Sequence, residues 1–468
     1  MFFPELLIEA TDSTLRIKVT GPRSALDRLK EYLTITNTSV SWQIREANKK
    51  LLANRVRGIS DDSTYSQYHL KQLAELLPLE TEELYFDEGT HLILPAGFFY
   101  LAKNATDFMD NKDVVPYYLP HLRDYQKQAV RQILTYKRGG IQAPTGTGKT
   151  SMVASLVLSL VKSGKRVMVV VPSEYLVGQV YNTISKYHDS VTAAGGGRHP
   201  ALGKDVIVVT AMSAKKYASS YPAVIVDESQ HLSAATWQDL LTANEEVEYV
   251  YSCSATPFRN DGLDLMIQAV SGKEMFSMTV RKAIEDGWLC KPLIYQVSVS
   301  TNLRFEGNAI KAYKTLVQDP KVFGFMRDKV AGGLAQGHKI LIIFKTVIAA
   351  KAFSKFCKGC DYQVAHGEYK KPLHDFAAGK IDVLLASSQL VSEGVDIPNT
   401  SMLIVVSNHS SDITSYQAIG RVLRNAEGKE HAIVLDVAVE GFRQFENAAK
   451  KRLAVYKEIT DNVFKLKI

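Results

Sequence analysis

The feature that most constrains the fold of this chain is a rhythm of short apolar runs after about residue 120. Runs rich in valine and isoleucine alternate with helix-length segments, and the first set is KRVMVVVP, DVIVVTA, PAVIVDE and EYVYSCSAT. A second set, KILIIFK, IDVLLASS, SMLIVVS and HAIVLDV, follows an interruption at about residues 272–307. Because these runs are apolar throughout, they are typical of parallel strands buried on both faces. They predict two doubly wound α/β domains in tandem.

The first 115 or so residues do not share this rhythm. TLRIKVTGPRSALDRLKEYLT predicts a strand, a turn at Gly21-Pro22 and an amphipathic helix, and HLILPAGFFYLA is a further apolar piece. We predict a small N-terminal α+β accessory domain before the two parallel-sheet domains. The expected bounds are 1–115 for the accessory domain, 116–293 for the first α/β domain and 294–468 for the second, which ends in a helical tail.

Composition places the chain among globular proteins. With 468 residues, 46% of them hydrophobic and 22% charged, it can bury sizeable cores. The longest apolar candidate for a membrane span is interrupted by Lys162, Gly164, Lys165 and Arg166, and MFFPELLIEA lacks the basic start of a secretory signal. Four cysteines favour a reducing compartment, so we predict a cytoplasmic protein.

Cysteine spacing and charge give two weaker signals. Cys357 and Cys360 form one CxxC, but no second ligand pair is near, which favours a plain thiol pair over zinc or redox use. Residues 16–57 carry ten basic side chains against three acidic ones, within a net charge of +7. Such a stretch suits a polyanionic partner, and an ordinary solvated surface is the alternative.

The segment IQAPTGTGKT predicts a phosphate-binding loop. It departs from the strict P-loop pattern only at Ala143, where glycine is usual. Gly146 and Gly148 let backbone N–H groups turn inward, Lys149 can reach the β- and γ-phosphates, and Thr150 can hold Mg²⁺. The apolar helix that follows would point its N-terminus at the phosphates.

Acidic and basic residues elsewhere complete a phosphoryl-transfer set. In VIVDESQH, Asp227 at a strand end can hold the Mg²⁺ shell and Glu228 can orient or deprotonate water, although an acidic helix cap is the alternative. In SYQAIGRVLRNAEG, Gln417, Arg421 and Arg424 can share one helix face, where arginine would stabilise the transition state. A plain basic surface helix is the alternative for that segment.

Taken in order, these segments resemble the motifs of superfamily 2 helicases and translocases, from Leu122 to Val437. The matching stretches are LRDYQKQAV, APTGTGKT, VPSEYLVGQ, the glycines around Gly196, Thr210, DESQH, SAT, LIIFKT, AHGE, ASSQLVSEGVDIP and QAIGRVLR. Ser173 stands where threonine is frequent, and Ser387-Ser388 replaces alanine-threonine. The resemblance implies that both α/β domains are RecA-like.

The resemblance also implies roles for individual residues. ATP would be bound by Arg123, Gln126, Thr145, Gly146, Thr147, Gly148, Lys149, Thr150, Asp227, Gly394 and Asp396, with Mg²⁺ at Thr150 and Asp227. Glu228, Arg421, Arg424 and Gln417 would act in catalysis. Nucleic-acid backbone contacts would fall to Pro172, Gly196, Thr210, Lys345, Thr346 and Ser388. In the accessory domain we expect duplex contact at Arg45, Lys49 and Lys50, with an ordinary solvated helix as the alternative.

Within the superfamily the chain most resembles phage branch-migration helicases of the UvsW type, which would place it in the host-cell cytoplasm. The expected function is an ATP-dependent DNA helicase acting on forks and junctions in recombination, repair or replication restart, with little sequence specificity and no membrane partner. Three alternatives stay open: a duplex DNA translocase that does not separate strands, an RNA helicase, and a binding switch gated by ATP.

Overall fold

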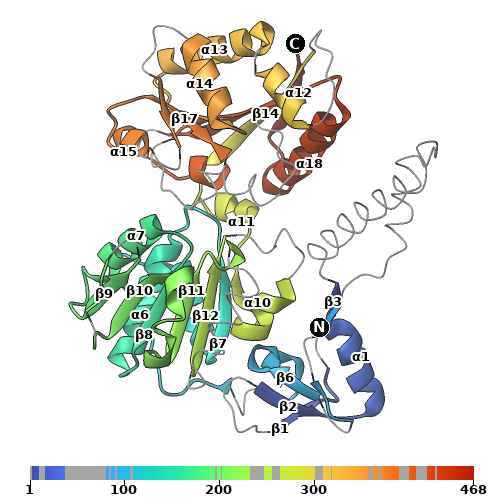
Figure 1. The fold of residues 1–468 in the computed structure, drawn as a ribbon, viewed down its shortest axis with the longest axis vertical. Helices are drawn as coiled ribbons and strands as arrows, with labels where there is room; N and C mark the ends of the chain where they lie inside the picture. The colour runs from blue at the N-terminus through green and yellow to red at the C-terminus, as the bar shows by residue number, and fades with distance from the viewer. Residues whose placement is uncertain are drawn as a thin grey trace, which may run out of the picture.

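The structure is a computed structural model. It describes residues 3–9, 16–36, 81–83, 86–89, 92–105, 109–195, 198–201, 203–231, 247–255, 264–300, 309–317, 319–356, 362–366, 369, 371–388, 400–406, 419–426 and 429–468. Figure 1 shows three parts, with the N-terminal region beside the first α/β domain and the second α/β domain beyond it.

The first α/β domain is built on a seven-stranded sheet in the order β13-β7-β12-β11-β8-β10-β9. Its strands are β7 (Arg138–Gln142), β8 (Val167–Val171), β9 (Val191–Ala194), β10 (Val206–Thr210), β11 (Ala223–Asp227), β12 (Tyr249–Ser254) and β13 (Glu274–Ser277). Every neighbouring pair is parallel. The apolar runs predicted as buried parallel strands are confirmed here, because β8 and β11 are buried at every position.

Helices cover both faces of this sheet, as expected for a doubly wound domain (Figure 1). They are α5 (Asp124–Ile133), α6 (Lys149–Lys162), α7 (Glu174–Ile184), the short α8 (Ala211–Ala214), α10 (Asp264–Ser271) and α11 (Val280–Glu285), with 3-10 turns η2 (Ala218–Ser220) and η3 (Ser229–His231). Helix α6 is buried on nearly all sides, which its sequence KTSMVASLVLSLVK requires.

The second α/β domain has its own seven-stranded sheet, ordered β16-β17-β15-β18-β19-β14-β20. The strands are β14 (Lys291–Val299), β15 (Ile340–Phe344), β16 (Tyr362–Ala365), β17 (Val383–Ser387), β18 (Met402–Val406), β19 (His431–Val439) and β20 (Val463–Lys467). The helices are α12 (Ala309–Leu316), α13 (Pro320–Ala335), α14 (Val347–Phe356), α15 (Lys371–Ala377) and α18 (Arg443–Ile459). All strand pairs are again parallel, so two tandem RecA-like domains are present.

The C-terminus differs from the expected helical tail. Helix α18 is present, but the chain continues into strand β20, which pairs in parallel with β14 at the sheet edge. Phe464 of β20 stacks on Tyr295 of β14 with ring centroids 5.2 Å apart. VFKLK is a short, alternating edge strand with mostly exposed side chains, so its sequence lacks the continuous apolar signal of the central strands.

The N-terminal region is a small α+β unit, as predicted. Its sheet, β1-β2-β6-β5, is antiparallel. The elements are β1 (Leu7–Glu9), β2 (Arg16–Thr20), α1 (Arg23–Leu33), β3 (Thr34–Thr36), β4 (Thr81–Glu83), β5 (Phe86–Asp87), β6 (Leu92–Pro95) and the 3-10 helix η1 (Ala96–Leu101). Its core also takes in Ala269 of α10, and the Tyr100 hydroxyl donates to Oε1 of Gln268 at 2.6 Å. The unit is thus packed against the first α/β domain.

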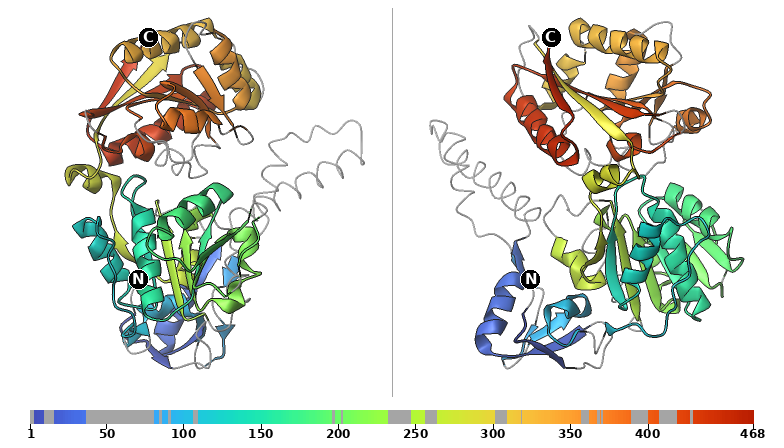
Figure 2. Two further views of the ribbon diagram at one scale, coloured as in Figure 1. Left: turned by 90° about the vertical axis from the view of Figure 1, so that its left-hand side faces the viewer. Right: turned by 180° about the vertical axis from the view of Figure 1, so that it is seen from behind.

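The two α/β domains are joined through α11 and the start of β14 (Figure 2). This connection makes direct hydrogen bonds to the second domain, for example from the N–H of Cys290 to the carbonyl of Leu423 at 2.7 Å. Among the helices that the structure describes, none is both long and apolar enough to cross a membrane.

Candidate nucleotide site

The phosphate-binding loop lies between strand β7 and helix α6, where the sequence predicts it. Gly146 and Gly148 have φ angles of 92° and 79°, in the left-handed region that favours glycine. A Cβ atom on Gly148 would displace the side-chain amide of Gln126. The backbone conformation therefore favours glycine at residue 148, and a larger residue would also disturb Gln126.

The acidic pair follows strand β11, beside the loop. The N–H of Glu228 donates to Oδ1 of Asp227 at 3.0 Å, and Glu228 has a φ angle of 51°, a strained conformation for this residue. Nζ of Lys149 lies 3.6 Å from Oε1 of Glu228. Burial, and then the charge of Glu228, raise the pKa of Asp227 to about 7, although Lys149 opposes the shift. A cation bound at the Asp227 carboxylate would stabilise its ionised form and offset the cost of burying that charge.

A hydrogen-bonded chain continues from Glu228 towards strand β12. Nε2 of Gln230 donates to Oε2 of Glu228 at 2.7 Å, and the hydroxyl of Ser254 donates to Oε1 of Gln230 at 2.7 Å. Gln230 and Ser254 belong to the DESQH and SAT segments noted in the sequence. The chain fixes the orientation of the Glu228 carboxylate from the neighbouring strand.

The two arginines come from the second α/β domain and face this loop. A Cβ atom on Gly146 would lie 2.9 Å from Cγ of Arg424, and one on Gly420 would lie 3.0 Å from Cβ of Thr145. Arg421 is buried, and burial lowers its pKa to about 10 while Glu228 partly offsets the shift. At that pKa Arg421 still carries its charge at neutral pH.

These groups line one cavity of about 300 Å³ between the domains. Its lining residues are Arg123, Thr145, Gly146, Gly148, Lys149, Thr150, Leu176, Gln179, Asp227, Glu228, Trp288, Arg421, Arg424 and Asn425. The structure thus brings together most of the residues predicted for the ATP site. It adds Leu176, Gln179, Trp288 and Asn425, to which the sequence analysis gave no role. Leu176 and Gln179 lie in the quoted segment VPSEYLVGQ and Asn425 follows Arg424, so three of the four carried a positional hint, and Trp288 carried none.

Two residues predicted to bind ATP lie behind the loop instead of lining the cavity. Nε2 of Gln126 donates to the carbonyl of Thr147 at 2.8 Å, and Oε1 of Gln126 accepts from the N–H of Arg123 at 2.8 Å. The Thr147 hydroxyl donates to the carbonyl of Pro144 at 2.6 Å, and its side chain is fully buried. Both side chains hold the loop in its conformation.

Other predicted residues lie outside the residues that the structure describes. They are Gln417, Gly394, Asp396, Gly196, Arg45, Lys49, Lys50 and the pair Cys357 and Cys360. Their roles remain predictions from the sequence.

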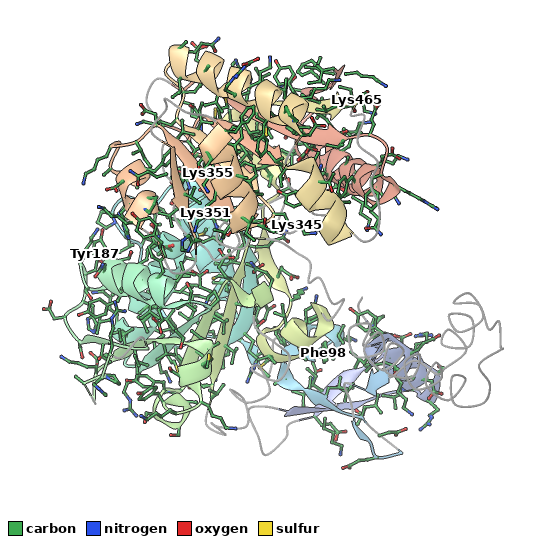
Figure 3. The ribbon with its side chains drawn as sticks, turned by 45° about the horizontal axis from the view of Figure 1, so that its top comes forward. Phe98, Tyr187, Lys345, Lys351, Lys355 and Lys465 are labelled. Atoms are coloured by element: carbon green, nitrogen blue, oxygen red, sulfur yellow. The ribbon has the colours of Figure 1, made fainter. Side chains whose placement is uncertain are left out.

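The remaining predicted nucleic-acid contacts lie at the carboxyl ends of parallel strands. Pro172 follows β8, Thr210 ends β10, Lys345 and Thr346 follow β15, and Ser388 follows β17. Oγ1 of Thr346 accepts from the N–H of Ala349 at 3.3 Å at the start of α14. In Figure 3 the Lys345 side chain lies on the side of the second domain that faces the first. Ligands of open α/β sheets bind at this edge.

The residues present fit Mg²⁺ and a nucleoside triphosphate. Mg²⁺ is usually held by one or two carboxylates with phosphate oxygens and water, which matches the buried Asp227 beside Thr150. Within the described ranges there is no cluster of three or more His, Cys, Asp or Glu side chains that could hold a metal alone.

Comparison with known proteins gives the same picture. Residues 119–259 match the family "Type III restriction enzyme, res subunit", and residues 326–426 match "Helicase conserved C-terminal domain". The chain is 26% identical over 382 residues to the DNA 3'-5' translocase XPB2 of Sulfurisphaera tokodaii, covering 71% of this chain and 84% of that protein. It is 23% identical over 360 residues to the ATP-dependent DNA helicase uvsW of Enterobacteria phage T4, covering 70% of each.

A solved structure shares the fold. The fragment of a putative HsdR subunit of a type I restriction enzyme from Vibrio vulnificus YJ016 matches with a TM-score of 0.58 at 17% identity, over 75% of this chain and 69% of that one. Two RecA-like domains with a phosphate loop on one side and arginines on the other define a helicase-type motor ATPase. The chain belongs to the superfamily 2 helicases, in the group of DNA helicases and translocases.

Proposed function

We propose that this chain hydrolyses ATP in the cavity between its α/β domains to unwind and migrate branched DNA. One observation carries the hydrolytic part. Lys149, Asp227 and Glu228 of the first domain line the same cavity as Arg421 and Arg424 of the second. Phosphoryl transfer needs positive charge around the transferred group and a carboxylate near the attacking water, and this set offers both.

Each residue has a distinct part in this proposal. When bound, Mg²⁺-ATP supplies the bond to be cleaved and a divalent charge on its phosphate oxygens. Thr150 and Asp227 would hold the metal, and Lys149 would neutralise the terminal phosphates. Glu228 would orient water and accept its proton, held in place by the hydrogen bond from Gln230. Arg421 and Arg424 are kept buried, where their charge acts most strongly.

Movement along DNA would follow from the shared site. Nucleotide contacts both domains, so binding favours their approach and phosphate release removes that preference. Pro172, Thr210, Lys345, Thr346 and Ser388 would grip the backbone, together with Gly196. Contacts of this kind carry no sequence information, so little sequence specificity is expected.

The proposed preference for forks and junctions draws on the relatives of this chain and on its basic N-terminal stretch. Relatives include T4 uvsW, named a DNA helicase, and the RecG helicase of Aquifex aeolicus. The basic stretch with Arg45, Lys49 and Lys50 is our proposed duplex contact, within the proposed accessory domain 1–115. A cytoplasmic location is also part of the proposal, supported by free thiols at Cys253 and Cys290.

A second candidate is a duplex translocase that does not separate strands. It is favoured by the similarity to XPB2, whose name is DNA 3'-5' translocase and of which the match covers 84%. An RNA helicase and an ATP-gated switch are further alternatives that the following measurement separates.

The experiment is the ATPase rate of the full chain with no nucleic acid, single-stranded DNA, linear duplex, a fork, a four-way junction and RNA, at one fixed salt concentration. Greater stimulation by forks and junctions than by linear DNA would support the branched-DNA proposal. Equal stimulation by linear duplex, without strand displacement on forks, would favour the translocase. Stimulation by RNA alone would overturn the DNA assignment, and negligible turnover with every ligand would favour the switch.

A further inference from the structure

Trp288 is an aromatic side chain on the connection between the two α/β domains. It is half-buried and lines the cavity. Its ring centroid lies 5.0 Å from that of Tyr125, with 46° between the ring planes, and the Arg123 guanidinium lies 5.2 Å from the Trp288 ring. The backbone N–H of Trp288 donates to the carbonyl of Ala283 at 2.8 Å and so fixes the chain that carries the ring. Tyr125 and Arg123 hold the ring itself from two directions, while part of it faces the cavity.

The chemistry of the lining separates a phosphate part from a base part. The glycine loop, Lys149, the acidic pair and the two arginines suit phosphates and metal. Trp288 is the one aromatic among the described lining residues, and indole and guanidinium planes are the surfaces on which nucleobases stack. We propose that Trp288 is the platform for the nucleobase of the bound nucleotide, with Arg123 beside it. This inference rests on the proposed ATP site and deepens it.

A second contact sets the platform relative to the phosphate loop. The hydroxyl of Tyr125, which packs on Trp288, donates to the carbonyl of Thr147 at 2.6 Å. Trp288 is thus connected through one side chain to the loop that holds phosphates. A base stacked on Trp288 and phosphates on the loop would be held at a defined separation, as one nucleotide requires.

Trp288 is also connected to the arginine segment of the second domain, which is the segment that carries Arg421 and Arg424. Nδ2 of Asn425 donates to the carbonyl of Gly287 at 2.9 Å, and the N–H of Cys290 donates to the carbonyl of Leu423 at 2.7 Å. These bonds lie on either side of Trp288 in the sequence. Base contact and arginine placement therefore depend on the same short piece of chain.

The test compares two ligands that differ by the nucleoside. Binding of Mg²⁺-ATP and of Mg²⁺-tripolyphosphate is measured by calorimetry on the full chain for the wild type, Trp288→Ala and Trp288→Phe. Trp288→Ala is expected to weaken ATP binding by about ten-fold, which is in the range of a lost base–aromatic stack. The affinity for tripolyphosphate should stay within about two-fold of the wild-type value. Trp288→Phe should keep most of the ATP affinity, because it keeps a ring.

Two controls make the result specific. Tyr187→Ala removes a 39% exposed aromatic outside the cavity lining and should change neither ligand. Lys149→Ala should weaken the binding of both ATP and tripolyphosphate. If Trp288→Ala weakens ATP and tripolyphosphate equally, or neither, the platform is refuted. If the wild type binds neither ligand, the proposed ATP site itself fails, which is a separate outcome.

A fluorescence measurement covers the case in which Trp288→Ala does not fold. ATP should change the tryptophan emission of the wild type, tripolyphosphate should change it much less, and Trp288→Phe should lose the ATP response. An ATP response that survives in Trp288→Phe would come from Trp42 or Trp237 and would contradict the proposal.

Discussion

Nζ of Lys149 lies 3.6 Å from Oε1 of Glu228, so the lysine of the phosphate loop and the carboxylate proposed to activate water form an ion pair. Both side chains are largely buried, with exposed fractions of 8% and 15%. Their attraction is therefore weakly screened by solvent. The pair links the two segments that, in our proposal, act on the same phosphate.

The first prediction concerns the lysine. Lys149→Ala removes the positive charge that would face the terminal phosphates, so ATP turnover should fall by about 100-fold or more. Turnover is measured by phosphate release at saturating DNA. The circular dichroism spectrum should match that of the wild type, and turnover near the wild-type rate would remove the phosphate-loop assignment.

The second prediction concerns the chain from Ser254 through Gln230 to Glu228. Glu228→Gln should retain ATP binding and lose about 100-fold or more in turnover, because an amide cannot accept the proton from water. Ser254→Ala removes the hydrogen bond to Gln230, worth about 1 kcal/mol, and should lower turnover a few-fold.

Calorimetry measures ATP binding and single-turnover hydrolysis measures the rate of the chemical step. Together they show, for each variant, whether ATP binding or turnover has been lost. An unchanged rate in Ser254→Ala would show that Gln230 keeps its orientation without strand β12.

The third prediction concerns the arginine from the second domain. Arg424→Ala should lower turnover by about 1,000-fold, at the lower end of the range for arginine fingers, while ATP affinity changes less. Arg424→Lys should recover little of the lost turnover, since an ammonium group does not offer the planar set of donors of a guanidinium. The ratio of kcat to KM in each variant is the measurement, and a proportional loss of ATP affinity would contradict a role in the transition state.

The fourth prediction concerns pH. Nζ of Lys429 donates to the carbonyls of Thr400, Val422 and Arg424 and so holds the end of the arginine segment. Burial lowers the pKa of Lys429 to about 8, with Arg424 adding to the shift and Cys290 opposing it. Below that pH the ammonium has a proton for each of three carbonyls, and above it one donor is lost. Turnover should therefore decline as pH rises through about 8.

Substitutions of Lys429 itself provide the controls for this pH effect. Lys429→Arg keeps its charge at high pH and should flatten the decline, whereas Lys429→Met should lower turnover at every pH. A pH profile of kcat that is identical in the wild type and Lys429→Arg would rule out Lys429 as its source.

The fifth prediction concerns stability. Nη2 of Arg452 lies 2.8 Å from Oδ1 of Asp436, with exposed fractions of 3% and 0%, and Nε2 of Gln296 also donates to Asp436. Asp436→Ala leaves a buried guanidinium without its charge partner and should cost about 3–5 kcal/mol of unfolding free energy. Urea unfolding measures this loss, and a cost below about 1 kcal/mol would show that water reaches Arg452.

The central strands and the phosphate loop were predictable because their signals are local. Buried parallel strands need continuous apolar runs, and PTGTGKT combines the glycines, lysine and threonine that phosphates require. The positions of Gln126 and Thr147 behind the loop were not predictable from the sequence, although both are residue types whose side chains can bind ATP. Whether Gln126 points to a nucleotide or to the Thr147 carbonyl depends on a contact between separate segments.

Trp288 was missed for a related reason. In the sequence it stands in DGWLCKP, which is typical of a turn with a packed aromatic residue. Its place in the cavity follows only from the approach of Tyr125 from a distant helix. Strand β20 was missed because its alternating, exposed residues give a weak signal. The domain bounds chosen from the sequence remain a prediction.

Leu289 pairs with Arg424 through an antiparallel bridge, and this pairing has a mechanical consequence. Residues on both sides of Trp288 are bonded to the second domain, and Arg281 of α11 donates to the carbonyls of Lys457 and Glu458 in α18. The connecting segment would therefore move with the second domain, and a pivot between the domains would lie before Arg281, near the end of strand β13. Any rotation about that pivot would slide the indole ring across Tyr125, so that a movement of the second domain would change the cavity wall formed by the first.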